Sequence, residues 1–271
     1  PMLYSQLCLT GKFSLDELAQ LRQWGSPTTG HPEFDIARGI ENTSGPLGQG
    51  HVFAIGAAIA AKFLAAHTGN PTFEKETIYA YISDGGIEEE ISQGGARVAS
   101  VLGLDNLIMF YDSNDIQLST ETKEVLNEDT AAKYRALGWY VIEINGNDAA
   151  QIRKAIEEAK AVKGQPTLII GKCIMGKGAL KADGTSYEAD CKTHGAPLGG
   201  DAFVNTVKNL GGDPENPFQI FDDVKELYAN RAKELQAICE ERYAEEKAWA
   251  DANPEKAAQL TEWFSGKAPV I

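Results

Sequence analysis

The stretch that decides the fold class runs from Thr77 to Ile116 and reads TIYAYISDGGIEEEISQGGARVASVLGLDNLIMFYDSNDI. It opens and closes on short runs rich in Ile, Tyr, Leu and Met, with a helix-like segment from Glu88 to Leu102 between them. Short apolar runs bounded by turn residues are typical of strands, and a helix between two of them is typical of a parallel sheet. The stretch therefore predicts an α/β fold.

The same alternation continues along the chain to Cys173. Further strand-like segments lie at 139–144 and 167–173, and further helix-like segments lie at 129–137 and 149–162. The sequence therefore predicts a parallel sheet flanked by helices, with residues 1–217 as one domain. From Phe218 onward the chain is polar and helical, with a break at Pro254. We interpret 218–271 as a helical C-terminal extension and the start of a linker.

Two helices are expected before the sheet. Ser14 and Glu17 have the spacing of a capping box, which predicts a helix running through Leu21. A second helix, from His51 to His67, is rich in small residues that permit close packing in the interior: Gly56, Ala57, Ala58, Ala60 and Ala61. The Gly- and Pro-rich segment between the two helices is too long for a plain connector, and loops of this length usually carry function.

Composition and charge exclude some classes of partner. The chain has 271 residues, 43% of them hydrophobic, and a formal net charge of -14. No basic surface is available to neutralise a nucleic-acid backbone, so we expect no nucleic-acid partner. Any phosphate site in so acidic a chain requires a metal ion or a group of backbone N–H donors.

The cysteines and the apolar segments bear on location. The four cysteines lie far apart, which favours a reduced, cytoplasmic setting over a disulfide framework or a zinc site. The longest apolar stretch, from Val52 to Ala66, is interrupted by Lys62 and is interpreted as too short to span a bilayer. We therefore expect no membrane association. Because the chain opens directly on an apolar helical pattern at Pro1, we also expect sequence upstream of it.

Oxygen ligands follow two of the predicted strands. Asp84 and Gly85 come after the first strand, and Asn114 and Ile116 come after the second. Because the carboxyl ends of adjacent parallel strands meet at one edge of a sheet, we expect these residues to lie close together. A carboxylate, an amide oxygen and a backbone carbonyl suit Mg²⁺ or Ca²⁺. Either segment alone is more often an ordinary turn.

The order and spacing of these residues resemble a known family. Asp84-Gly85 and Asn114 look like the thiamine-diphosphate motif that opens with Gly-Asp-Gly and closes with Asn. Over essentially the whole chain, the blocks that resemble transketolase and its N-terminal diphosphate-binding domain are Thr29-Gly30-His31-Pro32-Glu33, Ser44-Gly45-Pro46-Leu47-Gly48-Gln49-Gly50, Phe110-Tyr111-Asp112 with Asn114 and Ile116, and Thr193-His194-Gly195-Ala196-Pro197-Leu198-Gly199.

The resemblance implies roles for particular residues. It assigns Asp84, the side chain of Asn114 and the main-chain carbonyl of Ile116 to a divalent cation, Mg²⁺ with Ca²⁺ or Mn²⁺ as alternatives. His31 and His194 are implied to be catalytic, at the thiazolium carbon where substrate is cleaved. The residues implied to bind thiamine diphosphate are Gly45, Pro46, Leu47, Gly85, Asn114 and His194.

One further assignment and two departures concern the acidic residues after Asp84. Glu89 matches the family's acidic residue near the subunit interface of a homodimer, although Glu88 and Glu90 flank it. Ser83 stands where the family has the first glycine of its motif, and Glu90 stands where a glycine usually follows the interface glutamate. The acidic run repels a diphosphate, so we expect strict metal dependence.

Other residues have simpler interpretations. For His51 and His67 we expect solvated or locally hydrogen-bonded side chains, and Cys173 and Cys191 are interpreted as a core residue and a loop thiol. The aromatic residues at 218, 221 and 228 are interpreted as packing residues.

The resemblance implies a transferase of the pentose phosphate pathway. The intact homodimer would move a two-carbon ketol unit from a ketose phosphate to an aldose phosphate. The pyrimidine-binding and C-terminal domains of the family lie outside this chain, so we expect the chain alone to be inactive. Two alternatives stay open: another thiamine-diphosphate enzyme, of the phosphoketolase or deoxyxylulose-phosphate synthase type, and a noncatalytic binding module that retains the fold.

Overall fold

The computed structural model describes residues 1–267 and centres on a parallel sheet. The strands are β1 (Ile78–Ser83), β2 (Leu107–Ser113), β3 (Tyr140–Asn145) and β4 (Thr167–Lys172). Their order in the sheet is β1-β2-β4-β3, and every neighbouring pair is parallel. The predicted α/β class and parallel sheet are therefore confirmed, with strand ends within two residues of the expected ones.

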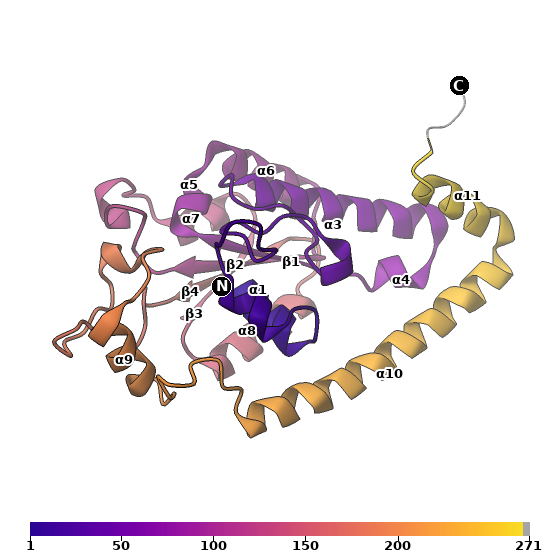
Figure 1. Cartoon of the computed structure of the whole chain (residues 1–271). Coiled ribbons are helices and arrows are strands. Elements are labelled where there is room, and N and C mark those ends of the chain that lie inside the picture. The colour runs from indigo at the N-terminus through magenta and orange to yellow at the C-terminus, as the bar shows by residue number, and fades with distance from the viewer. Residues whose placement is uncertain (268–271) are drawn as a thin grey trace.

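Helices cover both faces of the sheet (Figure 1). In chain order they are α1 (Met2–Leu9), α2 (Leu15–Ala19), α3 (Gln49–Thr68), α4 (Pro71–Glu74), α5 (Asp84–Glu88), α6 (Glu90–Val101), α7 (Thr130–Ala136), α8 (Ala149–Ala161), α9 (Gly200–Asn209), α10 (Asp222–Ala252) and α11 (Pro254–Phe264). Short 3-10 turns lie at η1 (Ile36–Arg38), η2 (Thr122–Glu124) and η3 (Cys191–Thr193).

Two separate apolar clusters hold these layers together. On one face, α3, α6 and α7 pack on the sheet through residues such as Ala58, Ala99 and Tyr134, all of them fully buried. On the other face, Ala155 and Ala159 of α8 pack against Ile169. The central strands β2 and β4 are buried on both faces, which explains their nearly continuous apolar sequences.

The capping box at the N-terminus forms as predicted. Glu17 N–H donates to Ser14 Oγ at 3.2 Å, and Ser14 N–H donates to Glu17 Oε2 at 2.8 Å. The helix ends at Ala19, however, two residues before the predicted Leu21. Arg22 adopts a left-handed φ of 64°, which a continuing helix cannot contain.

Helix α3 differs from the prediction in its length and in its burial. It is 20 residues long and, by length and composition alone, apolar enough to cross a membrane, so the prediction that this stretch is too short is wrong. Core helices pass the same test, and Ala58 and Ala61 do lie in the core. The opposite side, which includes Gly56, Ala57 and Ala60, is exposed, so only part of the predicted interior packing is present.

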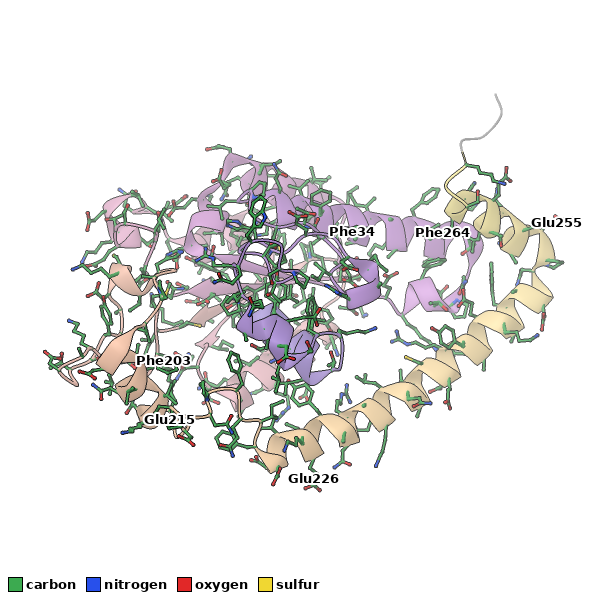
Figure 2. All side chains as sticks on the ribbon, viewed as in Figure 1. Phe34, Phe203, Glu215, Glu226, Glu255 and Phe264 are labelled. Carbon is green, nitrogen blue, oxygen red and sulfur yellow. The ribbon has the colours of Figure 1, made fainter. Side chains whose placement is uncertain are left out.

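The C-terminal extension is helical, with its break at Pro254 as predicted. Figure 1 shows α10 running past the sheet domain toward α11, which lies near the C-terminal end of α3. There the Trp263 ring lies 5.2 Å from the His67 ring, centroid to centroid. Side chains leave α10 on both sides from Glu226 onward, toward Glu255 in the first turn of α11 (Figure 2). The boundary drawn at 217/218 stays a prediction.

Candidate functional site

The ends of β1 and β2 bring Asp84 and Asn114, two of the predicted metal ligands, together. Ser83, the last residue of β1, pairs with Asp112 in β2, so the segments that follow both strands leave the sheet at the same edge. Asp84 is the first residue of α5 and is 1% exposed. Its carboxylate is therefore buried where the predicted metal ligands converge.

Asp84 accepts hydrogen bonds on both carboxylate oxygens. The Tyr111 hydroxyl donates to Oδ1 at 2.7 Å, and the backbone N–H of Asn114 donates to Oδ2 at 3.0 Å. Burial and the adjacent Asp84 carboxylate raise the pKa of Tyr111, so this hydroxyl stays protonated as a donor. Within residues 1–267, Asp84 has no basic side chain as an ion-pair partner. A buried carboxylate without a counter-charge suits a bound cation.

Asn114 is held by a tight local turn. Its Oδ1 accepts from the backbone N–H of Ile116 at 3.1 Å, and Asp115 between them has a left-handed φ of 65°. Asn114 and Ile116 are both buried. The amide oxygen has a second lone pair, which could coordinate a cation. The turn thus gathers the carboxylate and the amide that the resemblance assigns to the metal, and the roles of Asn114 and Ile116 as ligands stay predictions.

No alternative metal centre competes with this one among the residues that the structure describes. Across 1–267, no three His, Cys, Asp or Glu side chains cluster as a metal-binding group. A metal site built on Asp84 would therefore rely on amide, backbone and external oxygens, which is the chemistry of Mg²⁺ and Ca²⁺ rather than of zinc.

The glycine-rich loop at 45–50, whose last two residues begin α3, lies against the start of α5. A methyl group added at Gly85 would come within 3.3 Å of Leu47 Cδ1, and one added at Gly45 would come within 3.2 Å of His31 Cγ. Gly45 also has a φ of 130°, which favours glycine. The loop therefore brings Leu47, Gly85 and His31 into one region, beside Pro46, as the resemblance implies. Leu47 already lies against Gly85, so a side chain at this position would crowd that contact.

Arg22, which the sequence analysis did not single out, connects the segments that carry His31 and His194. Its Nη1 donates to the carbonyl oxygen of Gly195 at 3.2 Å, next to His194. A methyl group added at Gly30, next to His31, would meet Arg22 Nε at 2.9 Å. His31 and His194 are both exposed. No local pattern marks Arg22, because its partners lie elsewhere in the chain.

Glu89 separates α5 from α6, where the sequence predicted one helix starting at Glu88. Its side chain is exposed, and its Cβ would lie 2.8 Å from a methyl group added at Gly48, so the loop and this break are in close contact. Burial, with the negative charges of Asp84, Glu128 and Glu89, raises the pKa of Glu88. The carboxylates of Asp84 and Glu89 therefore repel that of Glu88, and a bound divalent cation would offset this repulsion.

The remaining residues divide between the interior and the surface. His51 is buried rather than solvated, and it bonds Ser92, as described below. His67 is exposed and bonds Gln259 at 3.1 Å, as expected for a locally hydrogen-bonded side chain. Burial and the Asp112 carboxylate raise the pKa of Cys173 to about 12, so this thiol is not a nucleophile at neutral pH.

Comparison with known proteins gives consistent matches. Residues 1–269 match the family model described as transketolase, thiamine diphosphate binding domain. Over 99% of its length the chain is 39% identical to the transketolase of Staphylococcus epidermidis and 40% identical to the probable transketolase of Streptococcus pneumoniae. It covers 40% and 41% of those two proteins, so it spans about 40% of the length of these relatives.

Solved structures agree with the sequence comparison. Transketolase from Leishmania mexicana superposes with a TM-score of 0.89 at 34% identity, over 99% of this chain and 41% of that one. A transketolase from Pichia stipitis in complex with sedoheptulose 7-phosphate has a TM-score of 0.89 at 33% identity, over 99% of this chain and 40% of that one.

Proposed function

The chain belongs to the transketolase family as a thiamine diphosphate binding domain, and on that premise we propose that it supplies the metal- and diphosphate-binding half of a ketol-transferring enzyme. The whole enzyme would move a two-carbon ketol unit from a ketose phosphate to an aldose phosphate. The hydrogen bond between Asn114 and Asp84, immediately before Gly85, is the observation that carries the proposal. It joins the two halves of the motif, which follow β1 and β2, at one edge of the sheet, where both residues are buried.

The proposed metal is Mg²⁺, with Ca²⁺ or Mn²⁺ as alternatives. Asp84 would hold it with the side chain of Asn114 and the carbonyl of Ile116. The fit rests on the burial of Asp84 without an ion-pair partner in the described chain and on the oxygen-only donor set. In an acidic chain the cation would also offset repulsion between the diphosphate and the residues 88–90.

The proposed roles of the loop residues follow from the same region. Gly45, Pro46, Leu47 and Gly85 would line the cofactor, because Leu47 packs against Gly85 and a glycine lets a ligand approach the backbone closely. Thiamine diphosphate, when bound, supplies the carbon nucleophile that breaks the ketose carbon–carbon bond. His31 and His194 would bind donor hydroxyls and move protons there, since both are exposed and neither is committed to the core.

We further propose that the whole enzyme is a homodimer, with Glu89 near its interface. Beside Glu89, the exposed side of α3 and the start of α6 form an apolar groove. Its lining residues are Gln49, Val52, Phe53, Gly56, Ala57, Ala60 and Ile91. An apolar surface of this kind is typical of a protein–protein contact. We also propose that the whole enzyme is cytoplasmic and acts in the pentose phosphate pathway. Its pyrimidine-binding and C-terminal domains would lie outside this chain.

The test is an assay of the full-length protein. With thiamine diphosphate and Mg²⁺, we expect a ketose phosphate to lose two carbons and an aldose phosphate to gain them, and we expect chelation with EDTA to abolish the reaction until Mg²⁺ is restored. Cleavage of the donor without extension of any aldose phosphate would instead favour a phosphoketolase-type reaction. Absence of both reactions would favour a noncatalytic module.

A further inference from the structure

His51 occupies a buried position directly behind the candidate cofactor site. It is the third residue of α3, and it follows the 45–50 loop without a break. Its side chain is 5% exposed, although histidine is usually at least partly solvated. The roles proposed above use neither this ring nor its hydrogen-bond partner.

The His51 ring is one end of a buried hydrogen-bond chain. His51 Nδ1 lies 2.7 Å from Ser92 Oγ, and Ser92 Oγ lies 2.8 Å from the carbonyl oxygen of Gly86. A carbonyl oxygen can only accept, so the single Ser92 hydroxyl proton points to Gly86. The Ser92 oxygen must then accept from His51, which places the ring proton on Nδ1.

This chain joins the two glycine-rich segments of the site. Gly86 follows Asp84 and Gly85, whereas His51 is rigidly connected to the 45–50 loop through the first turn of α3. Ser92 also lies close to the loop, because a methyl group added at Gly48 would come within 3.0 Å of its Oγ. The three linked groups of His51, Ser92 and Gly86 are all buried.

We propose that His51 is a positioning residue that holds residues 84–86, at the start of α5, in register with the 45–50 loop, and thereby pre-forms the cradle for the cofactor diphosphate. The inference rests on the proposed function, because it takes that cradle as the diphosphate site. Preorganisation of a site raises affinity by lowering the ordering cost of binding. Loss of the chain should therefore appear in cofactor affinity.

The ring acts here as a neutral hydrogen-bond donor. Burial lowers the pKa of His51 to about 4, which agrees with a single ring proton at neutral pH. Its bond to Ser92 uses that proton, so His51 is not a candidate for proton transfer to substrate. Its contribution is to geometry, which separates it from the exposed His31 and His194.

The test compares variants of the full-length protein by calorimetric titration with thiamine diphosphate at saturating Mg²⁺. His51→Leu and Ser92→Ala remove the chain, and His51→Asn retains a donor nitrogen where Nδ1 lies. His67→Leu, at the exposed end of the same helix, is the matched control. We expect His51→Leu and Ser92→Ala each to weaken binding by about three- to tenfold, as for a lost buried hydrogen bond. We expect His51→Asn and His67→Leu to bind within about twofold of wild type.

Two further readouts separate positioning from a general loss of stability. The double variant should lose no more affinity than the weaker single one, because both substitutions break one chain. Turnover at saturating cofactor should stay within about twofold of wild type.

Three outcomes would overturn the inference. The first is unchanged affinity in Ser92→Ala and in a folded His51→Leu. The others are additive losses in the double variant, and a His51→Asn variant that binds as weakly as His51→Leu. If His51→Leu does not fold, Ser92→Ala and His51→Asn decide it. Failure of the wild type to bind the cofactor would refute the proposed function itself.

Discussion

The guanidinium of Arg22 donates a hydrogen bond to the carbonyl oxygen of Gly195, 3.2 Å away and 173 residues later in the chain. The same side chain lies against Gly30, so it touches the neighbours of both His31 and His194. One residue thus links the N-terminal loop to the loop after η3. We therefore expect the relative position of the two histidines to depend on this link.

We predict that Arg22→Met raises the KM for the ketose donor by about three- to fivefold, since the link is one exposed hydrogen bond. Cofactor affinity should not change, because no described hydrogen bond of Arg22 reaches Asp84 or the 45–50 loop. Steady-state kinetics and calorimetry on the full-length enzyme measure both quantities. Arg22→Lys is the matched variant: it keeps the charge but not the planar fork, and it should be intermediate. A normal KM in Arg22→Met would show that the two loops hold their positions without it.

Asp84 supplies the only carboxylate among the proposed metal ligands. Asp84→Asn should weaken thiamine diphosphate binding by on the order of a hundredfold, and added Mg²⁺ should restore it only in part. Asp115→Asn is the control, because Asp115 is an exposed carboxylate close by that pairs with Lys172. Calorimetric titration at several Mg²⁺ concentrations measures the effect. Equal affinities for Asp84→Asn and the wild type would remove this site from the proposal.

Much of this arrangement could be predicted from sequence because it follows from local patterns. Runs of Ile, Leu and Tyr located the strands to within two residues, and parallel pairing then required Asp84 and Asn114 to lie at the same edge. The residues that were missed depend on tertiary contacts. Arg22 acts on a carbonyl far along the chain, and helical periodicity does not reveal which atom the His51 ring contacts. Similarly, the small residues of α3 predicted close packing, but they lie on all sides of the helix and did not indicate which side packs against the sheet domain.

His31 and His194 should affect catalysis more than cofactor binding, since both are exposed and neither contacts Asp84 in the described hydrogen bonds. In each alanine variant we expect turnover to fall by on the order of a hundredfold, the usual scale for a lost acid–base group. Donor KM should rise, while the Kd for thiamine diphosphate should stay within about threefold. His67→Ala is the matched control. A collapse of cofactor binding with normal turnover at saturation would mean that the roles are inverted.

Stability should fall on acidification because of His51. Burial lowers its pKa to about 4 in the folded chain, whereas an unfolded histidine titrates near about 6.5. Below that unfolded value the unfolded state binds more protons, so its free energy falls relative to the folded state. Between about pH 7.5 and pH 5 the loss from this group is about 2 kcal/mol. Urea unfolding midpoints at the two pH values should show it, and His51→Asn should show a smaller shift. Identical shifts in both proteins would assign the pH dependence to other groups.

The last prediction concerns the chain by itself. We expect the 271-residue chain to bind thiamine diphosphate poorly and to catalyse no ketol transfer, because its relatives extend well beyond the region it matches. A cofactor held on one side only loses contact area and preorganisation together. The acidic residues at 88–90 add to the loss, since the diphosphate would then depend on a weakly held cation.

A reconstitution experiment tests this directly. Sedimentation and a ketol-transfer assay are run on the chain with and without a fragment that carries the remaining domains of the full-length protein. We expect self-association of the chain through the groove on α3, and activity only in the mixture. Mass spectrometry excludes contaminating full-length enzyme. Ketol transfer by the chain alone would contradict the prediction, because one half-site would then suffice for both cofactor binding and chemistry.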